Sequence, residues 1–77
     1  MPEYNLKYGD EFKFFAQTPS EVVPVMQERR RSGDNEHSFM HRSAMEMCEW
    51  NGKNYYFHSR EAFADSMMKN GLLEVVD

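Results

Sequence analysis

The sequence predicts an α+β domain in which one β-sheet carries two helices on one face. Residues 4–8 alternate between apolar and polar side chains, which is the pattern of a half-buried strand. Asn51-Gly52 is a strong signal for a tight hairpin turn, and Thr18 and Ser59 each begin a segment with the features of a helix start. We therefore expect the order β-β-α-β-β-α-β in a small single-sheet domain that comprises residues 1–77.

The first two strands are expected to form a hairpin around Gly9-Asp10. A two-residue loop there would place charged side chains on the apolar face, whereas a three-residue loop from Gly9 to Glu11 keeps the apolar residues together. The three-residue loop predicts three facing pairs, which are Tyr8 with Phe12, Leu6 with Phe14, and Tyr4 with Ala16. Phe15 is left on the opposite face of the sheet, so we expect that face to be partly covered.

The next segment is expected to be a helix over residues 18–31. Thr18 can cap it, Pro19 suits its first position, and Glu21 stands where a capping box places an acid. Pro24 removes a backbone donor inside this segment. Either a first turn at residues 18–22 therefore precedes a second start at Pro24, or the helix is kinked.

Residues 37–49, which follow a polar loop, allow two interpretations. Gly33 is expected to stop the preceding helix in a polar loop. After the loop, the Met, Ala, Glu and Arg content favours a helix over residues 37–49, whereas the Asn51-Gly52 turn requires a strand on each side of it. We interpret residues 44–50 and 54–58 as the strands of a second hairpin, with Trp50 facing Lys53. Three consecutive aromatic residues, Tyr55, Tyr56 and Phe57, support the second of these strands.

The stretch from Trp50 to Val76 contains the clearest local signals in the chain. Ser59 has the position of a helix N-cap and Asn70-Gly71 that of a helix end, which predicts a helix between them. The apolar run over residues 72–76 then predicts a strand that is buried on both faces and therefore lies in the interior of the sheet. We interpret this stretch as the folding scaffold of the domain.

The composition excludes several classes of protein. The single cysteine, Cys48, allows no intramolecular disulfide, which favours a reducing compartment. No apolar run is long enough to cross a bilayer and no signal peptide is visible, so we expect a mature, soluble, cytoplasmic protein without membrane contact. A net charge of −4 argues against a module that binds duplex nucleic acid. The seven methionines suit either an adaptable core or a binding surface that can repack.

Three histidines and the cysteine are the candidate metal ligands. His37 and His41 are spaced so that they would share one side of a helix, where Cys48 or His58 could complete a zinc site. The chain has no paired CxxC motif, and we expect no metal or other cofactor. Cys48 is also the candidate nucleophile, because a nearby histidine could activate it. No catalytic motif surrounds it, and we expect no enzymatic activity.

Residues 51–63, NGKNYYFHSREAF, resemble the core of the YHS/TRASH-type metal-binding domains. Gly52-Lys53, the aromatic run and Ser59 match the Gly-Lys, aromatic-strand and Phe-Cys-Ser elements of that family. His58 stands where the family has a metal-binding cysteine, the helix cysteine falls near Ala62 or Phe63, and Cys48 is the candidate for the upstream cysteine. The resemblance implies a strand-turn-strand-helix unit and leaves His58 as the matched position that could still bind a metal.

The function expected from these observations is that of a small non-catalytic module that binds another protein, as an inhibitor or an adaptor. One candidate contact is the basic cluster Arg29, Arg30 and Arg31, which could bind an acidic partner or complement the end of a helix. The other is a sheet face that carries Phe15, Met45, Met47 and Tyr56 and could also form a homodimer. The alternatives are a degenerate YHS/TRASH-like zinc-binding domain and a single-stranded nucleic-acid binder that uses Lys53, the aromatic run and the arginine cluster.

Overall fold

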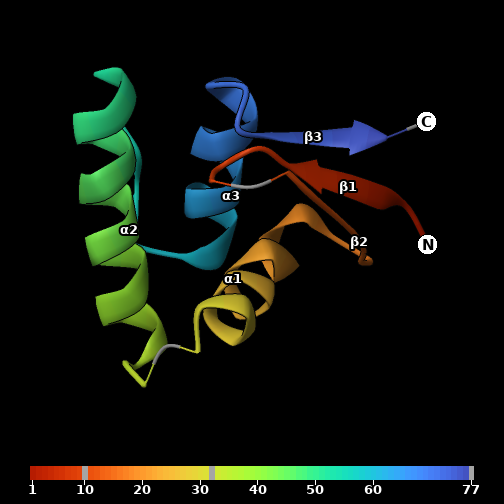
Figure 1. The fold of residues 1–77 in the computed structure, drawn as a ribbon, viewed down its shortest axis with the longest axis horizontal. Helices are drawn as coiled ribbons and strands as arrows, with labels where there is room; N and C mark the ends of the chain where they lie inside the picture. The colour runs from red at the N-terminus through yellow and green to blue at the C-terminus, as the bar shows by residue number, and fades with distance from the viewer. Residues whose placement is uncertain (10, 32, 77) are drawn as a thin grey trace.

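The part of the chain that the structure describes contains a three-stranded antiparallel sheet and three α-helices (Figure 1). It comprises residues 1–9, 11–31 and 33–76 of a computed structural model. The elements are β1 (Glu3–Leu6), β2 (Phe12–Phe15), the 3-10 turn η1 (Pro19–Glu21), α1 (Val22–Arg30), α2 (Glu36–Asn51), α3 (Arg60–Lys69) and β3 (Leu73–Val76). The α+β class is confirmed, but α2 replaces the predicted second hairpin. None of the helices among these residues has the length and apolar character needed to span a bilayer.

The helices lie on one side of the sheet, as predicted. The strand order is β2-β1-β3, and the sheet face that carries Tyr4, Leu6 and Leu73 is buried. In Figure 1, α1 and α3 lie next to the sheet and α2 lies on their far side. Four methionines fill the core between these layers, which makes packing their main use: Met26, Met40, Met47 and Met67.

The first hairpin has the predicted faces but not the predicted register. Leu6 pairs with Phe12 and Tyr4 with Phe14, whereas a three-residue loop would pair Leu6 with Phe14. The two registers differ by two positions, so each side chain keeps its face and the alternation cannot distinguish them. Asp10, within the predicted loop, lies outside the described residues. Phe15 lies on the outer face and is 66% exposed, so the partial cover expected there is absent at Phe15, although Asn5 on the same face is buried.

The predicted helix over residues 18–31 divides into η1 and α1, which is close to the first of the two alternatives. The Glu21 carboxylate accepts hydrogen bonds from the backbone N–H groups of Gln17, at 2.6 Å, and Thr18, at 3.2 Å. Because α1 begins at Val22, Pro24 falls in its first turn, where a backbone N–H would have no partner within the helix. Proline is therefore accommodated without breaking α1.

The end of α1 lies before Gly33, the predicted stop. Arg31 adopts a left-handed backbone with φ of 51° and its N–H donates to the Glu28 carbonyl. A left-handed conformation is uncommon for a residue other than glycine, so the sequence pattern favoured Gly33. Arg29 and Arg30 occupy the last turn of α1, where their charges complement the helix dipole.

Residues 36–51 form the single helix α2, so the predicted strand at residues 44–50 is wrong. The Asn35 side chain caps its start by accepting the Ser38 N–H at 2.8 Å. Gly52, with φ of 72°, ends it and donates its N–H to the Cys48 carbonyl at 2.7 Å. The Asn51-Gly52 pair predicts a hairpin because glycine accepts a left-handed backbone, and the same property lets it terminate a helix.

The predicted helix after Ser59 is confirmed as α3. The Ser59 hydroxyl accepts the Ala62 N–H at 3.1 Å. At the other end the Gly71 N–H donates to the Met68 carbonyl and the Leu72 N–H to the Met67 carbonyl, which is a Schellman motif. The chain thereby leaves α3 and enters β3 directly.

The last strand, β3, lies at an edge of the sheet, so the prediction of an interior strand is wrong. It pairs with β1, which is the central strand of the order β2-β1-β3. Leu73 is buried, whereas Val75 is 46% exposed. The apolar run at residues 72–76 therefore reflects the burial of its first residues. It does not mean that both faces of β3 are buried.

An ion pair joins the first turns of α2 and α3. The Arg60 guanidinium donates to the Glu36 carboxylate, with Nε 2.7 Å from Oε1 and Nη2 2.5 Å from Oε2. This hydrogen bond, with the positive charge of Arg60, lowers the pKa of the Glu36 carboxyl from its ordinary value. A carboxyl whose pKa is lower in the folded state stabilises the fold above its unfolded pKa and loses that contribution as the pH falls through its folded pKa.

Substituting alanine at Gly52 tests the end of α2. A Cβ at Gly52 meets no atom within 4 Å, so the cost comes from the left-handed backbone and should be about 1–2 kcal/mol in urea unfolding. Gly33→Ala is the matched control, because its surroundings are equally open and its φ is not positive. It should change the unfolding free energy little or raise it. Equal effects of the two substitutions would contradict the left-handed cap.

Removing the Glu36 charge tests the ion pair. Glu36→Gln should lower the unfolding free energy at pH 7 by no more than about 1 kcal/mol, because both partners are partly exposed. The difference from wild type should vanish when the pH is below the folded pKa of Glu36. Glu49→Gln, an exposed carboxylate near the other end of α2, is the control and should show no such loss. A pH-independent effect of Glu36→Gln would contradict the assignment.

Candidate functional site

The predicted contact face of Phe15, Met45, Met47 and Tyr56 does not form one surface. Phe15 lies on β2, the two methionines lie on α2, and Tyr56 lies in residues 52–59, the connector between α2 and α3. Met47 is fully buried, whereas the other three are exposed. The prediction was wrong because it required a strand at residues 44–50, and in a helix residues two apart point in different directions.

The predicted metal ligands are spread over α2 and the connector. His37 and His41 share one side of α2, and their ring centroids lie 5.8 Å and 4.6 Å from that of Phe57. Cys48 and His58 are exposed. Within residues 1–9, 11–31 and 33–76, no three His, Cys, Asp or Glu side chains form a group that could hold a metal ion.

Two arginines stack on aromatic rings where the C-terminal ends of α1 and α2 approach the chain between β1 and β2. The Arg29 guanidinium lies 3.9 Å from the centroid of the Phe12 ring, and that of Arg30 lies 4.7 Å from the Tyr8 ring. The Tyr8 ring meets the Trp50 ring edge to face, with centroids 6.2 Å apart. These residues form the arginine–aromatic surface, which consists of Tyr8, Phe12, Arg29, Arg30, Glu46 and Trp50.

The arginine–aromatic surface keeps an exposed ring and positive charge. Trp50 is 63% exposed. Glu46 lies 3.5 Å from Arg30 and 3.5 Å from the Tyr8 hydroxyl, so it offsets part of the charge. Among the described ion pairs none includes Arg29 or the neighbouring Arg31. This end of α1 is therefore locally basic, although the whole chain carries a net charge of −4.

A pocket of about 220 Å³ opens beside the stacked arginines. Leu6 and Met26, which are both buried, give it an apolar floor. Tyr8, Arg29 and Arg30 complete its walls together with Gly9. An apolar cavity of about 150 Å³ can bind benzene, so this pocket has room for one side chain of a partner.

A second cleft, of about 420 Å³, lies between α1 and α2. Its arginines already have carboxylate partners, since Arg42 pairs with Asp34 and Arg30 with Glu46. The Asp34 carbonyl also accepts a hydrogen bond from Gln27. We therefore regard this cleft as part of the α1–α2 packing.

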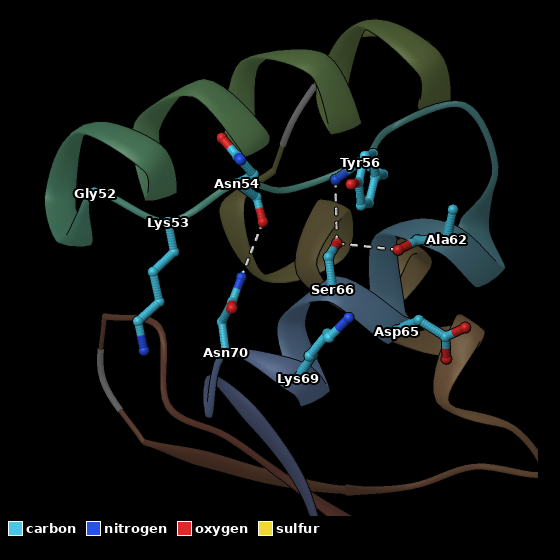
Figure 2. Close-up of a pocket in the computed structure, with 9 residues that line it drawn as sticks. All are labelled: Gly52, Lys53, Asn54, Tyr56, Ala62, Asp65, Ser66, Lys69 and Asn70. Carbon is cyan, nitrogen blue, oxygen red and sulfur yellow. Dashed lines mark hydrogen bonds between the residues drawn. The ribbon is translucent and has the colours of Figure 1, made fainter.

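A groove of about 640 Å³ runs between the connector and α3 (Figure 2). The connector contributes exposed Lys53 and Tyr56, and α3 contributes exposed Asp65 and Lys69. The remaining lining residues are small or neutral: Gly52, Asn54, Ala62, Ser66 and Asn70. Both cations and the tyrosine ring thus border one hollow.

Hydrogen bonds to α3 hold the connector in place and form this groove. The Tyr56 N–H donates to the Ser66 hydroxyl at 3.1 Å, and the Asn70 amide donates to the Asn54 carbonyl at 2.9 Å (Figure 2). The Ser66 hydroxyl lies 3.0 Å from the Ala62 carbonyl, which can accept its proton. The connector therefore has helix side chains as partners in place of a second strand, and the predicted strand at residues 54–58 is wrong.

Trp50 and Ser66 contribute to these sites but were not among the predicted site residues. Ser66 interrupts the apolar side of α3 between Phe63 and Met67, and it is buried. A buried hydroxyl is normally hydrogen bonded, so this position was a usable signal for a tethered backbone group. The exposure of Trp50 had no such signal, because it depends on α2 ending next to Tyr8.

Comparison of this chain with protein-family models, with curated proteins and with solved structures gives no match. The resemblance of residues 51–63 to YHS/TRASH-type domains implied a strand-turn-strand-helix unit. In the structure these residues are the end of α2, the connector and the start of α3. Function is therefore inferred from the geometry of the arginine–aromatic surface and of the groove.

Replacing Ser66 with alanine tests the connector tether. The change removes the hydroxyl that accepts the partly buried Tyr56 N–H. The loss should lower the unfolding free energy by about 1–3 kcal/mol. Ser38→Ala, at an exposed position in the first turn of α2, is the control and should change it by less than about 0.5 kcal/mol. Hydrogen exchange at the Tyr56 amide should accelerate in Ser66→Ala alone; unchanged protection would show that the tether is unimportant.

Proposed function

We propose that this chain is a non-catalytic protein-interaction module that binds an acidic segment of another protein on the arginine–aromatic surface. The observation that carries the proposal is the exposed Trp50 ring beside arginines that are already stacked on Tyr8 and Phe12. Tryptophan, tyrosine and arginine are the residues that contribute most often to binding energy at protein interfaces. Binding alone suits an inhibitor or an adaptor.

The stacked arginines support the proposal because their side chains are ordered before a partner arrives. Immobilising a flexible side chain at an interface costs about 0.5–1.5 kcal/mol. Contact with Phe12 holds Arg29, and contact with Tyr8 and Glu46 holds Arg30. Part of the cost of immobilising these side chains therefore does not arise on binding, because the free protein already orders them. Both guanidinium groups keep N–H donors for a partner.

The charges and the pocket define the chemistry of the partner. Arg29 and Arg31 have no carboxylate partner among the described residues, so acidic side chains complement them. The pocket over Leu6 and Met26 takes one apolar side chain. We therefore expect a segment in which an apolar residue is flanked by Asp or Glu. Cys48 fits a reducing compartment, and we place the interaction in the cytoplasm.

A peptide-display selection on the immobilised chain tests the proposed function. Enriched peptides should carry an apolar residue among acidic ones, and their affinity should fall as the salt concentration rises. Trp50 is the single tryptophan, so binding at this surface should shift its fluorescence emission to shorter wavelength. Enrichment of peptides without acidic residues, or of none, would contradict the proposal.

Two variants locate the binding site of a selected peptide. Arg29→Ala should weaken binding about tenfold, the scale of one interface arginine that contributes about 1.4 kcal/mol. Met45→Ala, an exposed apolar residue of α2 outside this surface, should leave the affinity unchanged. The proposal fails if Met45→Ala weakens binding as much as Arg29→Ala, or if the chain self-associates through Trp50 and excludes the peptide.

A further inference from the structure

The groove between the connector and α3 is formed before any ligand binds. Its two walls are joined by the Tyr56–Ser66 and Asn54–Asn70 hydrogen bonds. Its volume of about 640 Å³ falls within the range of pockets that bind small molecules. A wall that is already fixed does not have to be ordered on binding, which favours affinity.

Positive charge is available at two positions along this groove. Lys53 comes from the connector and Lys69 from the last turn of α3, and in Figure 2 Asn70 lies between the two side chains. Neither lysine forms an ion pair among the described residues. At this end of α3 the Met68 and Met67 carbonyl groups accept the Gly71 and Leu72 N–H groups. These hydrogen bonds reduce the negative potential at the C-terminal end of α3. An anion that enters the groove is therefore attracted by the two lysines.

The groove also presents an aromatic ring and a hydrogen-bond acceptor. Tyr56 is 59% exposed although it lines the groove, so its ring can stack on a planar group. Asp65, which also lines the groove, forms no ion pair among the described residues and can accept an N–H or O–H of a ligand. Ala62 beside them leaves space for a flat molecule.

The geometry points to a binding site for a small planar anion, that is, an aromatic ring that bears a phosphate or a carboxylate. Lys53 and Lys69 bind the anionic group, Tyr56 stacks on the ring, and Asp65 accepts a hydrogen bond from it. This site shares no residue with the arginine–aromatic surface, so it is independent of the proposed protein partner. A ligand with only an anionic group would use only the lysines, and a ligand with only a ring would use only Tyr56 and Asp65.

Titration of the isotope-labelled full chain, followed by amide NMR, tests this site. Adenosine monophosphate is the phosphate probe, and adenosine and inorganic phosphate are its two halves. The carboxylate probe is 4-hydroxybenzoate, and phenol and acetate are its two halves. One of the two complete probes should cause saturable shifts at Lys53, Tyr56 and Lys69, with an affinity at least about tenfold above either half. Which probe binds identifies the anionic group. The absence of saturable shifts with both complete probes would overturn the inference.

Variants separate this site from adventitious anion binding. Tyr56→Ala should weaken the complete probe about tenfold, on the scale of lost ring stacking, and Lys69→Ala should weaken it several-fold. Lys13→Ala, an exposed lysine of β2 outside the groove, should have no effect. The inference would be overturned if the bare anion, inorganic phosphate or acetate, bound as tightly as the binding probe that carries the same anionic group. It would also be overturned if Tyr56→Ala bound that probe normally while its amide spectrum showed a folded chain.

Discussion

The left-handed backbone at Gly52 is the constraint on which both candidate sites depend. It ends α2 at Asn51, and the chain then reverses beside α3. Upstream, this end leaves Trp50 in contact with Tyr8. Downstream, it places Lys53 and Tyr56 along the groove. A side chain at Gly52 would meet no atom within 4 Å, so the requirement is for the backbone conformation and not for space.

The two sites differ in how they combine charge with aromatic surface. On the arginine–aromatic surface the cations lie on the rings, and Trp50 remains free to contact a partner. In the groove the lysines and Tyr56 border a hollow that has room for a molecule between them. The first arrangement suits a protein segment and the second a small ligand. In a chain with a net charge of −4, both concentrate positive charge locally.

Sequence patterns predicted the elements whose signals are local and unambiguous. Thr18 to Glu21 and Ser59 mark helix starts that the structure confirms. The alternation at residues 4–8 predicted a strand where β1 lies, although β1 ends at Leu6. The hairpin predicted at Asn51-Gly52 was wrong because a glycine with positive φ suits a hairpin turn and a helix end equally well. Which one forms depends on whether residues 44–50 pack as a helix on the core, and that is a tertiary property. Of the predicted contacts, the arginine cluster contributes to a candidate site, whereas the sheet face with Met47 does not exist.

A proton NOE spectrum of the wild-type chain tests most directly whether residues 44–51 belong to helix α2 or to a hairpin. Trp50 has different neighbours in these two structures. The structure predicts contacts between the Trp50 indole and the Tyr8 ring, whose centroids lie 6.2 Å apart. It also predicts sequential amide–amide contacts through residues 44–51, which belong to α2. Contacts between Trp50 and Lys53 across a hairpin, without contacts to Tyr8, would contradict α2, the arginine–aromatic surface and the connector groove together.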